Sequence, residues 1–439
     1  MLPEKIKKWI FFAGIILPPV FIFCLIYKYG ITVPYWDQWE LVDDIEKFHN
    51  HTITLKDLWY YHNEHRILFP KILMILLASI SGWNIFLELC VSIVFACISL
   101  FLLFSLVNDT HGKKGNALLK IVISLLVFST AQYENWLWGW QITIYMSISM
   151  TIMAVWSINK WQGQMKGLVI AICAAIIANY SFGCGILVWP TLLFMLILQK
   201  KWKLKHIIIW LIVGFVTLAS YYYHYHSGSS YYTQITFFIQ HPIIFSQYIL
   251  GYLGASLGHR IYLANLIGLI LLIIIIFSIL DIWRLDKERL RKLIPWLTFV
   301  LFVIMTAFIT ALGRAVLGIG QALSSRYTTI STLLVISAIV LLYNSVILNL
   351  EKKEKASLKD IAFILIVSLS FCVAYITSYE FGVSEMKSIN MRVRNASVYL
   401  NDPDNASDKN LKALYPVTET LIHRIKVLKE LGYKFDTEN

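Results

Sequence analysis

Residues 9–44 read WIFFAGIILPPVFIFCLIYKYGITVPYWDQWELVDD, and this stretch decides how the rest of the chain is interpreted. Its first half is an apolar run long enough to cross a bilayer, and three lysines, Lys5, Lys7 and Lys8, precede it. No small-residue cleavage site follows the run, so we expect an uncleaved first span with a cytoplasmic N-terminus. The second half starts at Pro34, which ends the span, and interleaves aromatic with acidic residues.

The composition of the whole chain agrees with a membrane protein. Hydrophobic residues make up 58% of the 439 residues and charged residues only 15%, a balance that excludes a soluble globular domain. Further apolar runs, such as 261–282 and 361–377, have the length of transmembrane helices. The formal net charge of +12 could indicate nucleic-acid binding. The lysines and arginines form short clusters between apolar runs, however, which is typical of membrane topology, and no nucleic-acid partner is expected.

These basic clusters predict which connections face the cytoplasm, and they lie at 113–120, 160–166, 200–205, 284–292 and 352–359. The turns between them carry few positive charges and many Trp, Tyr, Gly and Gln residues. The alternation requires that two apolar segments, 68–81 and 237–257, do not cross the membrane. The first is short and contains Pro70 and Lys71, and the second is interrupted near His241. We expect both to be helices at the outer interface or half-buried among the spans.

The sequence therefore predicts an all-helical integral protein of the cell membrane, with the N-terminus cytoplasmic and the C-terminus external. We expect about eleven spans, at 8–28, 84–107, 118–132, 142–159, 166–180, 184–199, 206–222, 261–283, 293–312, 327–349 and 360–379. The fifth and sixth are also compatible with a re-entrant hairpin, which keeps the same sidedness. Residues 1–379 would form the transmembrane domain, with 31–83 as its first external loop. Residues 380–439 would form an external tail with one short amphipathic helix at 417–431.

Two segments of the first external loop contain candidate site residues. In PYWDQWELVDD (34–44), Asp37 and Glu40 are three residues apart and share a face if the segment is helical. An interfacial belt of tryptophans with solvated acids is the alternative. In YYHNEHRILFPK (60–71), four charged or titratable side chains lie within five residues, namely His62, Glu64, His65 and Arg66. They indicate either a site or a structural cluster of ion pairs.

The histidines of this loop also raise the question of a metal. His49, His51, His62 and His65 lie near carboxylates, so they or the acids alone could hold a divalent cation. Their spacing matches no defined ligand signature, and solvated loop histidines are common. No cofactor is therefore assigned with certainty.

Two later external turns add further candidates. In AQYENWLWGWQI (131–142), amide and carboxylate groups alternate with aromatic rings, a combination that suits a sugar, although an aromatic girdle would look similar. Its candidate residues are Tyr133, Glu134, Asn135, Trp136, Trp138 and Gln141. In LGRAVLGIGQALSSRYTTI (312–330), Arg314 and Arg326 flank a glycine-rich connection, followed by Tyr327. Arginines at the ends of spans either bind a lipid phosphate or snorkel to the interface. Arg260 is a weaker third candidate.

Over nearly its whole length this layout resembles the GT-C class of polytopic membrane glycosyltransferases, which use polyprenyl-phosphate-linked sugars. Those enzymes have a first span, a long external loop with a catalytic acid near its start, interfacial helices and many further spans. Asp37 in YWDQWE has the position of that acid. The stretch NEHRILFPK (63–71) is similar to a polar-then-proline segment of protein O-mannosyltransferases and the aminoarabinose transferase. The acid pair here is Asp37-x-x-Glu40 rather than adjacent, and a His-Pro-Pro-like pattern is absent.

The resemblance implies transfer of a sugar from a polyprenyl phosphate to an external acceptor, such as a cell-envelope glycan or polymer. It implies Asp37 as general base, with Glu40 or Glu64 positioning the acceptor or holding a cation. Arg326 and Arg314, with Arg66, would hold the lipid phosphate, and the 133–138 aromatics would line the pocket. A glycan polymerase or ligase of the same fold, a flippase or transporter of a lipid-linked sugar, and an accessory membrane protein are the alternatives. The nearly uncharged span interiors disfavour a transporter.

Overall fold

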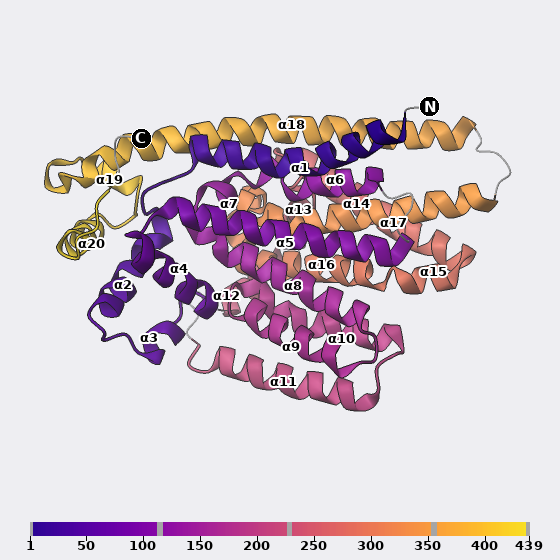
Figure 1. Ribbon diagram of the computed structural model, residues 1–439, viewed down its shortest axis with the longest axis horizontal. Coiled ribbons are helices and arrows are strands. Elements are labelled where there is room, and N and C mark those ends of the chain that lie inside the picture. The colour runs from indigo at the N-terminus through magenta and orange to yellow at the C-terminus, as the bar shows by residue number, and fades with distance from the viewer. Residues whose placement is uncertain (1–2, 112–116, 226–230, 353–357, 436–439) are drawn as a thin grey trace.

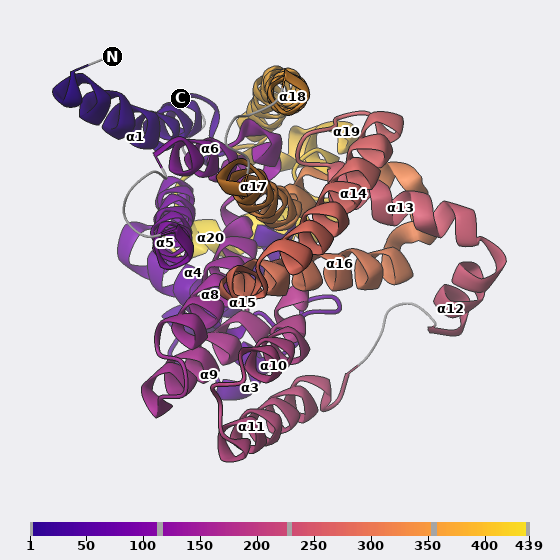
Figure 2. The same ribbon diagram turned by 90° about the vertical axis from the view of Figure 1, so that its right-hand side faces the viewer.

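The computed structural model describes residues 3–111, 117–225, 231–352 and 358–435 (Figure 1). Within these ranges the chain is helical and forms no strand, apart from an isolated backbone bridge between His62 and His65. The long helices run roughly side by side along the longest axis of the molecule, and Figure 2 shows the same bundle from its end. Several lysines used in the topology prediction, Lys113, Lys114, Lys353 and Lys355, lie outside the described residues.

Nine helical segments of the described chain are long and apolar enough to cross a membrane. They contain α1 (Glu4–Tyr29), α5 (Ile85–His111), α6 (Ala117–Val127) with α7 (Tyr133–Leu137), α8 (Ile142–Lys160), α11 (Leu204–Tyr222), α14 (Ile261–Leu285), α16 (Ile294–Arg314), α17 (Thr328–Lys352) and α18 (Leu358–Ser397). The other two predicted spans correspond to the shorter helices α9 (Met165–Asn179) and α10 (Val188–Gln199). The chain is thus a multi-pass membrane protein, with nine segments of full spanning length in the part described rather than eleven.

The two apolar segments expected not to cross are short helices. Helix α4 (Leu68–Ser81) has 14 residues and ends at Gly82, whose φ of 64° is the left-handed conformation that glycine adopts without strain. Its buried Lys71 pairs with Asp44, at 3.0 Å between the ammonium and the carboxylate. The second segment is divided at His241 into α12 (Tyr231–Gln240) and α13 (Pro242–Gly254). Neither piece reaches the length of a span.

The last long helix extends further than the sequence analysis predicted. Helix α18 does not end near Tyr379 but continues to Ser397, and 3-10 and short α-helices follow, including α19 (Asp408–Lys412). The cause lies in an apolar stripe that the polar composition hides: Met386, Ile389, Val393 and Ala396 recur at helical spacing and are buried. The amide of Asn390 also donates to the Tyr29 carbonyl oxygen, at 3.1 Å, and so ties α18 to the end of α1.

The first external loop and the C-terminal segment pack together at one end of the bundle. The loop contains η1 (Trp36–Leu41), α2 (Val42–His49), α3 (Leu55–Trp59) and α4. Helix α20 (Thr418–Glu430) buries Leu421, Ile425 and Leu428, and it packs against α2, where the Arg424 guanidinium lies 3.3 Å from the Asp43 carboxylate. Figure 1 shows these elements at the left end of the molecule.

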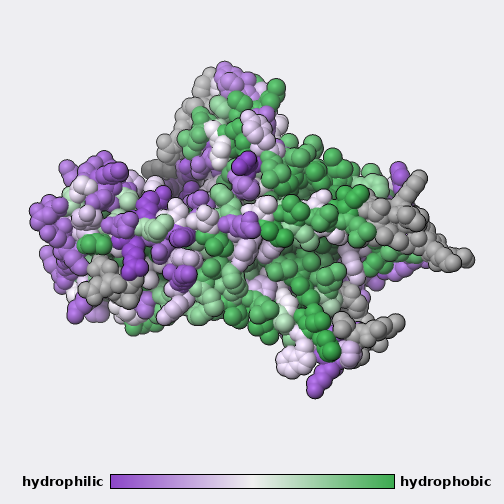
Figure 3. Space-filling view, turned by 90° about the horizontal axis from the view of Figure 1, so that it is seen from above, coloured by the Kyte–Doolittle hydropathy of each residue, from purple (hydrophilic) through white to green (hydrophobic). Residues whose placement is uncertain are grey.

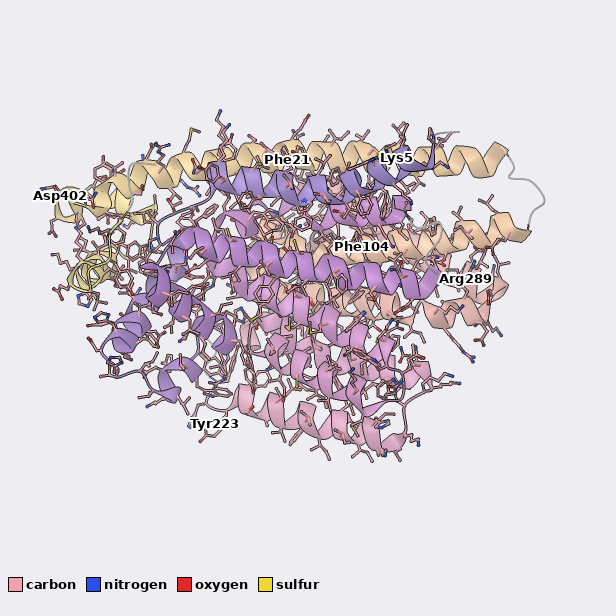
Figure 4. All side chains as sticks on the ribbon, viewed as in Figure 1. Lys5, Phe21, Phe104, Tyr223, Arg289 and Asp402 are labelled. Carbon is pink, nitrogen blue, oxygen red and sulfur yellow. The ribbon has the colours of Figure 1, made fainter. Side chains whose placement is uncertain are left out.

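The surface separates into an apolar middle and one polar end. In the view from above, hydrophobic residues dominate the central surface and hydrophilic residues cover the end that carries the loop and the C-terminal segment (Figure 3). Figure 4 places Lys5 and Arg289 toward the opposite end from Asp402. Lys5 and Arg289, from two of the basic stretches used in the topology prediction, thus lie away from the end that carries the C-terminal segment.

Impermeant thiol labelling tests the predicted sidedness. In a variant whose native cysteines are replaced by serine, Asp402→Cys should react with a charged maleimide in intact cells. Lys5→Cys should react only after the membrane is opened, since the positive-inside rule places the N-terminus in the cytoplasm. Reaction of both positions in intact cells, or of Lys5→Cys alone, would contradict the topology.

Candidate functional site

A strained turn carries Asp37 at the start of the first external loop. Trp36, just before it, has a φ of 49°, which is rare for a bulky side chain and costs on the order of 1–3 kcal/mol. The backbone N–H of Trp36 donates to the Leu414 carbonyl oxygen, at 2.8 Å, so the C-terminal segment holds this conformation. Asp37 lies in the first turn of η1, and a quarter of its side chain is exposed.

His62 lies between the two acids of the turn. Its Nδ1 is 2.9 Å from a carboxylate oxygen of Glu40, and its Nε2 is 3.5 Å from one of Asp37. The ring is buried and packs against Trp140, at 4.5 Å between ring centroids. Burial alone would lower the pKa of His62, but the hydrogen bonds and charges of Asp37 and Glu40 outweigh it and raise the pKa to about 9. The three groups therefore form a compact unit around a protonated imidazole at neutral pH.

Glu64 and His65, which follow His62 in the sequence, lie between this unit and Arg314. The Glu64 carboxylate is 3.1 Å from the guanidinium of Arg314, at the end of α16, and both side chains are partly exposed. The His65 ring packs on Phe182, with 5.1 Å between the ring centroids. Desolvation lowers the pKa of His65 to about 4, so this second histidine is neutral at pH 7.

The second arginine is held by the turn that precedes α8. The guanidinium of Arg326 lies 3.9 Å from the Glu134 carboxylate and donates to the Ser324 hydroxyl at 3.2 Å. The hydroxyl of Ser325 also donates to Glu134, at 3.1 Å. The buried amide of Asn135, in the same turn as Glu134, donates to the carbonyl oxygen of Arg326, at 3.2 Å, and so fixes the backbone at Arg326. About a third of the Glu134 and Arg326 side chains remains exposed.

Direct contacts connect the Asp37 turn to the Glu134–Arg326 pair. The Trp138 indole N–H donates to the carbonyl oxygen of Tyr35, two residues before Asp37, at 2.8 Å. Burial raises the pKa of the Tyr35 phenol, the hydrogen-bonded Arg392 opposes this rise, and the nearby Glu134 carboxylate adds to it. Three connecting segments that are far apart in the sequence therefore meet at one end of the bundle.

Tyr248 of α13 lies within electrostatic range of both arginines. Burial raises the pKa of its phenol, and the positive charges of Arg314 and Arg326 both act in the opposite direction. Tyr327, which follows Arg326, is nearly buried and stacks on Tyr252, with 5.1 Å between ring centroids. The charges of the two guanidinium groups thus act on the same phenol, which the apolar helix α13 supplies.

Arg66, predicted to help hold the lipid phosphate, is instead bound by the protein itself. The guanidinium of Arg66 is buried, donates to the carbonyl oxygens of Trp59, Tyr221 and Tyr223, and lies over the Tyr61 ring. Its donors are thus used within the protein, and we do not assign it to a phosphate.

The remaining candidates divide between the core and the surface. Trp136 is fully buried and stacks on Phe128 and Tyr145, so it packs the core rather than lining a pocket. Gln141 is also buried. Tyr133 is partly buried against Phe381, whereas Arg260 is exposed just before α14.

Sequence reasoning missed the contribution of Tyr415. Its hydroxyl donates to the Glu40 carboxylate, at 3.3 Å, while Arg424 lies over its ring. No local signal marks this residue, because it is separated from Glu40 by 375 positions. Ser324 and Ser325 were also missed, although their place directly before Arg326 was visible in the sequence.

The acids and histidines do not form an evident metal site. Across the described residues, no group of three or more His, Cys, Asp or Glu side chains is placed to hold a metal ion. His49 and His51 are exposed, and Glu64 and Glu134 are paired with arginines. We therefore assign no step of the chemistry to a metal.

The arrangement of the whole chain matches a known membrane fold. The archaeal oligosaccharyltransferase AglB from Archaeoglobus fulgidus, solved with an inhibitory peptide and a dolichol-phosphate, superposes with a TM-score of 0.54 at 13% sequence identity. The match covers 95% of this chain but 60% of the length of AglB. AglB is a GT-C glycosyltransferase, and the GT-C fold expected from the sequence is thereby confirmed. Neither the protein-family models nor the curated proteins compared with the sequence give a match.

The ion pairs of His62 predict a specific pH dependence of stability. The pKa of His62 rises from 6.5 to about 9 on folding, so its pairing stabilises the fold fully below pH 6.5 and is lost as the pH rises through 9. The melting temperature of the protein should fall by several degrees between pH 7 and pH 10, and His62→Gln should show a smaller decrease. Equal decreases in both proteins would show that His62 is not held as an imidazolium.

Proposed function

We propose that this protein is a membrane glycosyltransferase that moves a sugar from a polyprenyl-phosphate donor to an acceptor on the outer face of the membrane. The observation that carries the proposal is the convergence of Asp37 with two partly exposed arginines, Arg314 and Arg326, at one end of a GT-C bundle. One group can accept a proton, and the other two can hold a phosphate. The dolichol-phosphate in the AglB complex supports a lipid-linked donor.

Asp37 serves as the general base in this reaction. It removes the proton from the acceptor hydroxyl as the oxygen attacks the anomeric carbon, while the bond from that carbon to the phosphate oxygen breaks. The products are the glycosylated acceptor and free polyprenyl phosphate, and the simplest stereochemical course is inversion. His62 and Glu40 hold the turn and its charge in place. The Trp36 conformation and the Leu414 contact supply the same rigidity from the other side.

Arg314 and Arg326 stabilise the leaving phosphate. Negative charge grows on the phosphate as the sugar departs, and each aligned donor of this kind is worth roughly 3–4 kcal/mol in other enzymes. Glu64 and Glu134 keep the two guanidinium groups oriented before the lipid arrives. The bound phosphate then competes with these carboxylates, or shares the guanidinium donors with them. Tyr133 directly precedes Glu134, and its partly exposed ring offers a surface on which the sugar stacks.

Removal of the base should stop the reaction without disturbing insertion. With reconstituted protein and a labelled polyprenyl-phosphate sugar, Asp37→Asn should lower the release of polyprenyl phosphate by about a hundredfold or more. Asp43→Asn is the matched control, because Asp43 lies in the same loop but faces Arg424 and solvent. Near-normal release by Asp37→Asn would remove it as the base. Movement of the donor across the membrane without any release would identify a flippase instead.

Loss of an arginine should affect the use of donor lipid most. Arg326→Gln keeps a hydrogen-bonding side chain but removes the charge, and we expect the donor KM to rise about tenfold or more, with a lower kcat. Arg291→Gln, an exposed arginine paired with Glu288 on α15 (Lys287–Lys292), controls for a general loss of positive charge. Unchanged donor saturation in Arg326→Gln would place the phosphate elsewhere.

A further inference from the structure

A buried acid lies directly behind the Asp37 turn. Glu88 is in the first turn of α5, and its side chain has no exposed surface. One carboxyl oxygen accepts a hydrogen bond from the Gln38 amide at 2.6 Å, and the other accepts from the Trp83 indole at 3.0 Å. An acid at the end of a membrane helix is costly to bury, and two hydrogen bonds offset part of that cost. The proposed chemistry does not use it.

Gln38 transmits this contact to the backbone that carries Asp37. Gln38 follows Asp37 in the sequence and is fully buried. Its amide therefore points into the protein, whereas the Asp37 side chain is partly exposed. While its amide nitrogen donates to Glu88, its amide oxygen accepts from the backbone N–H of Tyr35 at 3.3 Å. A single side chain therefore joins both ends of the strained Tyr35–Gln38 turn to α5.

The segment around Gly139 covers the hydrogen bond between Gln38 and Glu88. Gly139 lies so near that a Cβ atom there would be 2.2 Å from the Glu88 carboxyl and 2.7 Å from the Gln38 amide nitrogen. A side chain at this position would push the Glu88 carboxyl or the Gln38 amide out of place. Its neighbours both contact the site: Trp138 donates to Tyr35, and Trp140 packs on His62. The Glu88–Gln38 pair thus lies where the two external segments join.

We propose that Glu88 is a positioning residue that fixes the Asp37 turn against the Trp138–Trp140 segment. Because the Glu88 side chain has no exposed surface, it acts through Gln38 and not on the substrate. Its effect on catalysis rests on the proposed function, whereas its effect on the order of the turn does not. A displacement of the base by about 1 Å can cost on the order of a hundredfold in rate, which is the scale of effect expected.

An exchange of the two side chains tests this role. In Glu88→Gln, one amide oxygen replaces two acceptors, so either Gln38 or Trp83 loses its partner and faces an N–H group. In Gln38→Glu, two carboxyl groups face each other. In the double variant the introduced amide can donate to the introduced carboxylate and still accept from Trp83, and that carboxylate can still accept from Tyr35. All three hydrogen bonds are retained with one reversed in direction.

We expect both single variants to lower kcat by about ten- to a hundredfold, with the donor KM changed less than about twofold, and the double variant to recover most of the loss. Amide hydrogen exchange of residues 35–41 should become faster in the single variants and return to the wild-type rate in the double variant. Ser99→Ala is the matched control, because it removes a buried hydrogen bond from the same helix at a distance from the turn. It should change neither measurement.

Other outcomes separate the two proposals. Unchanged exchange and kcat in the single variants, or losses that simply add in the double variant, would overturn the role of Glu88. If the wild-type protein transfers no sugar, the proposed function fails, yet the exchange rates still decide whether Glu88 orders the turn. If Glu88→Gln does not accumulate in the membrane, Gln38→Met removes the hydrogen bond to Glu88 from the loop side, together with the one from Tyr35, and should give the same faster exchange. Wild-type exchange in Gln38→Met would also overturn the proposal.

Discussion

The exclusion of charge from the bilayer interior is the constraint on which the rest of this structure depends. A lone charge inside hydrocarbon costs several kcal/mol or more, so charged groups of a membrane bundle gather where helices begin and end. Connections that return to the same side therefore bring together residues that are far apart in the chain. Asp37, Glu134 and Arg326 belong to three such connections, and contacts through Tyr35, Trp138 and Ser325 join them.

Within this cluster, charges of opposite sign are paired before any ligand arrives. His62 lies between two acids, and each of the two arginines faces a glutamate. Such pairs orient donors and acceptors at the cost of competition with a bound phosphate. For the proposed transferase, a fixed geometry matters more than tight ground-state binding, because catalysis depends on groups aimed at charge that develops later. The C-terminal segment contributes to the same rigidity through Leu414 and Tyr415.

Local patterns predicted those features that depend on few residues. The length of 68–81, with Pro70 and Lys71 inside it, was enough to predict a short helix, and the apolar stripe of 417–431 predicted α20. Features set by distant contacts were not predictable. Arg66 looked available for a phosphate, yet three backbone carbonyls from two regions of the chain occupy it. Trp136 looked like a sugar platform, but its rings stack in the core between Phe128 and Tyr145.

The most direct test of the shared site is an experimental map of the protein in lipid nanodiscs with a non-hydrolysable polyprenyl-phosphate sugar bound. The account predicts phosphate density within hydrogen-bonding distance, about 3 Å, of Arg314 or Arg326. It also predicts the anomeric carbon on the side that faces Asp37. Lipid phosphate at the other end of the bundle, or a sugar remote from Asp37, would contradict the account.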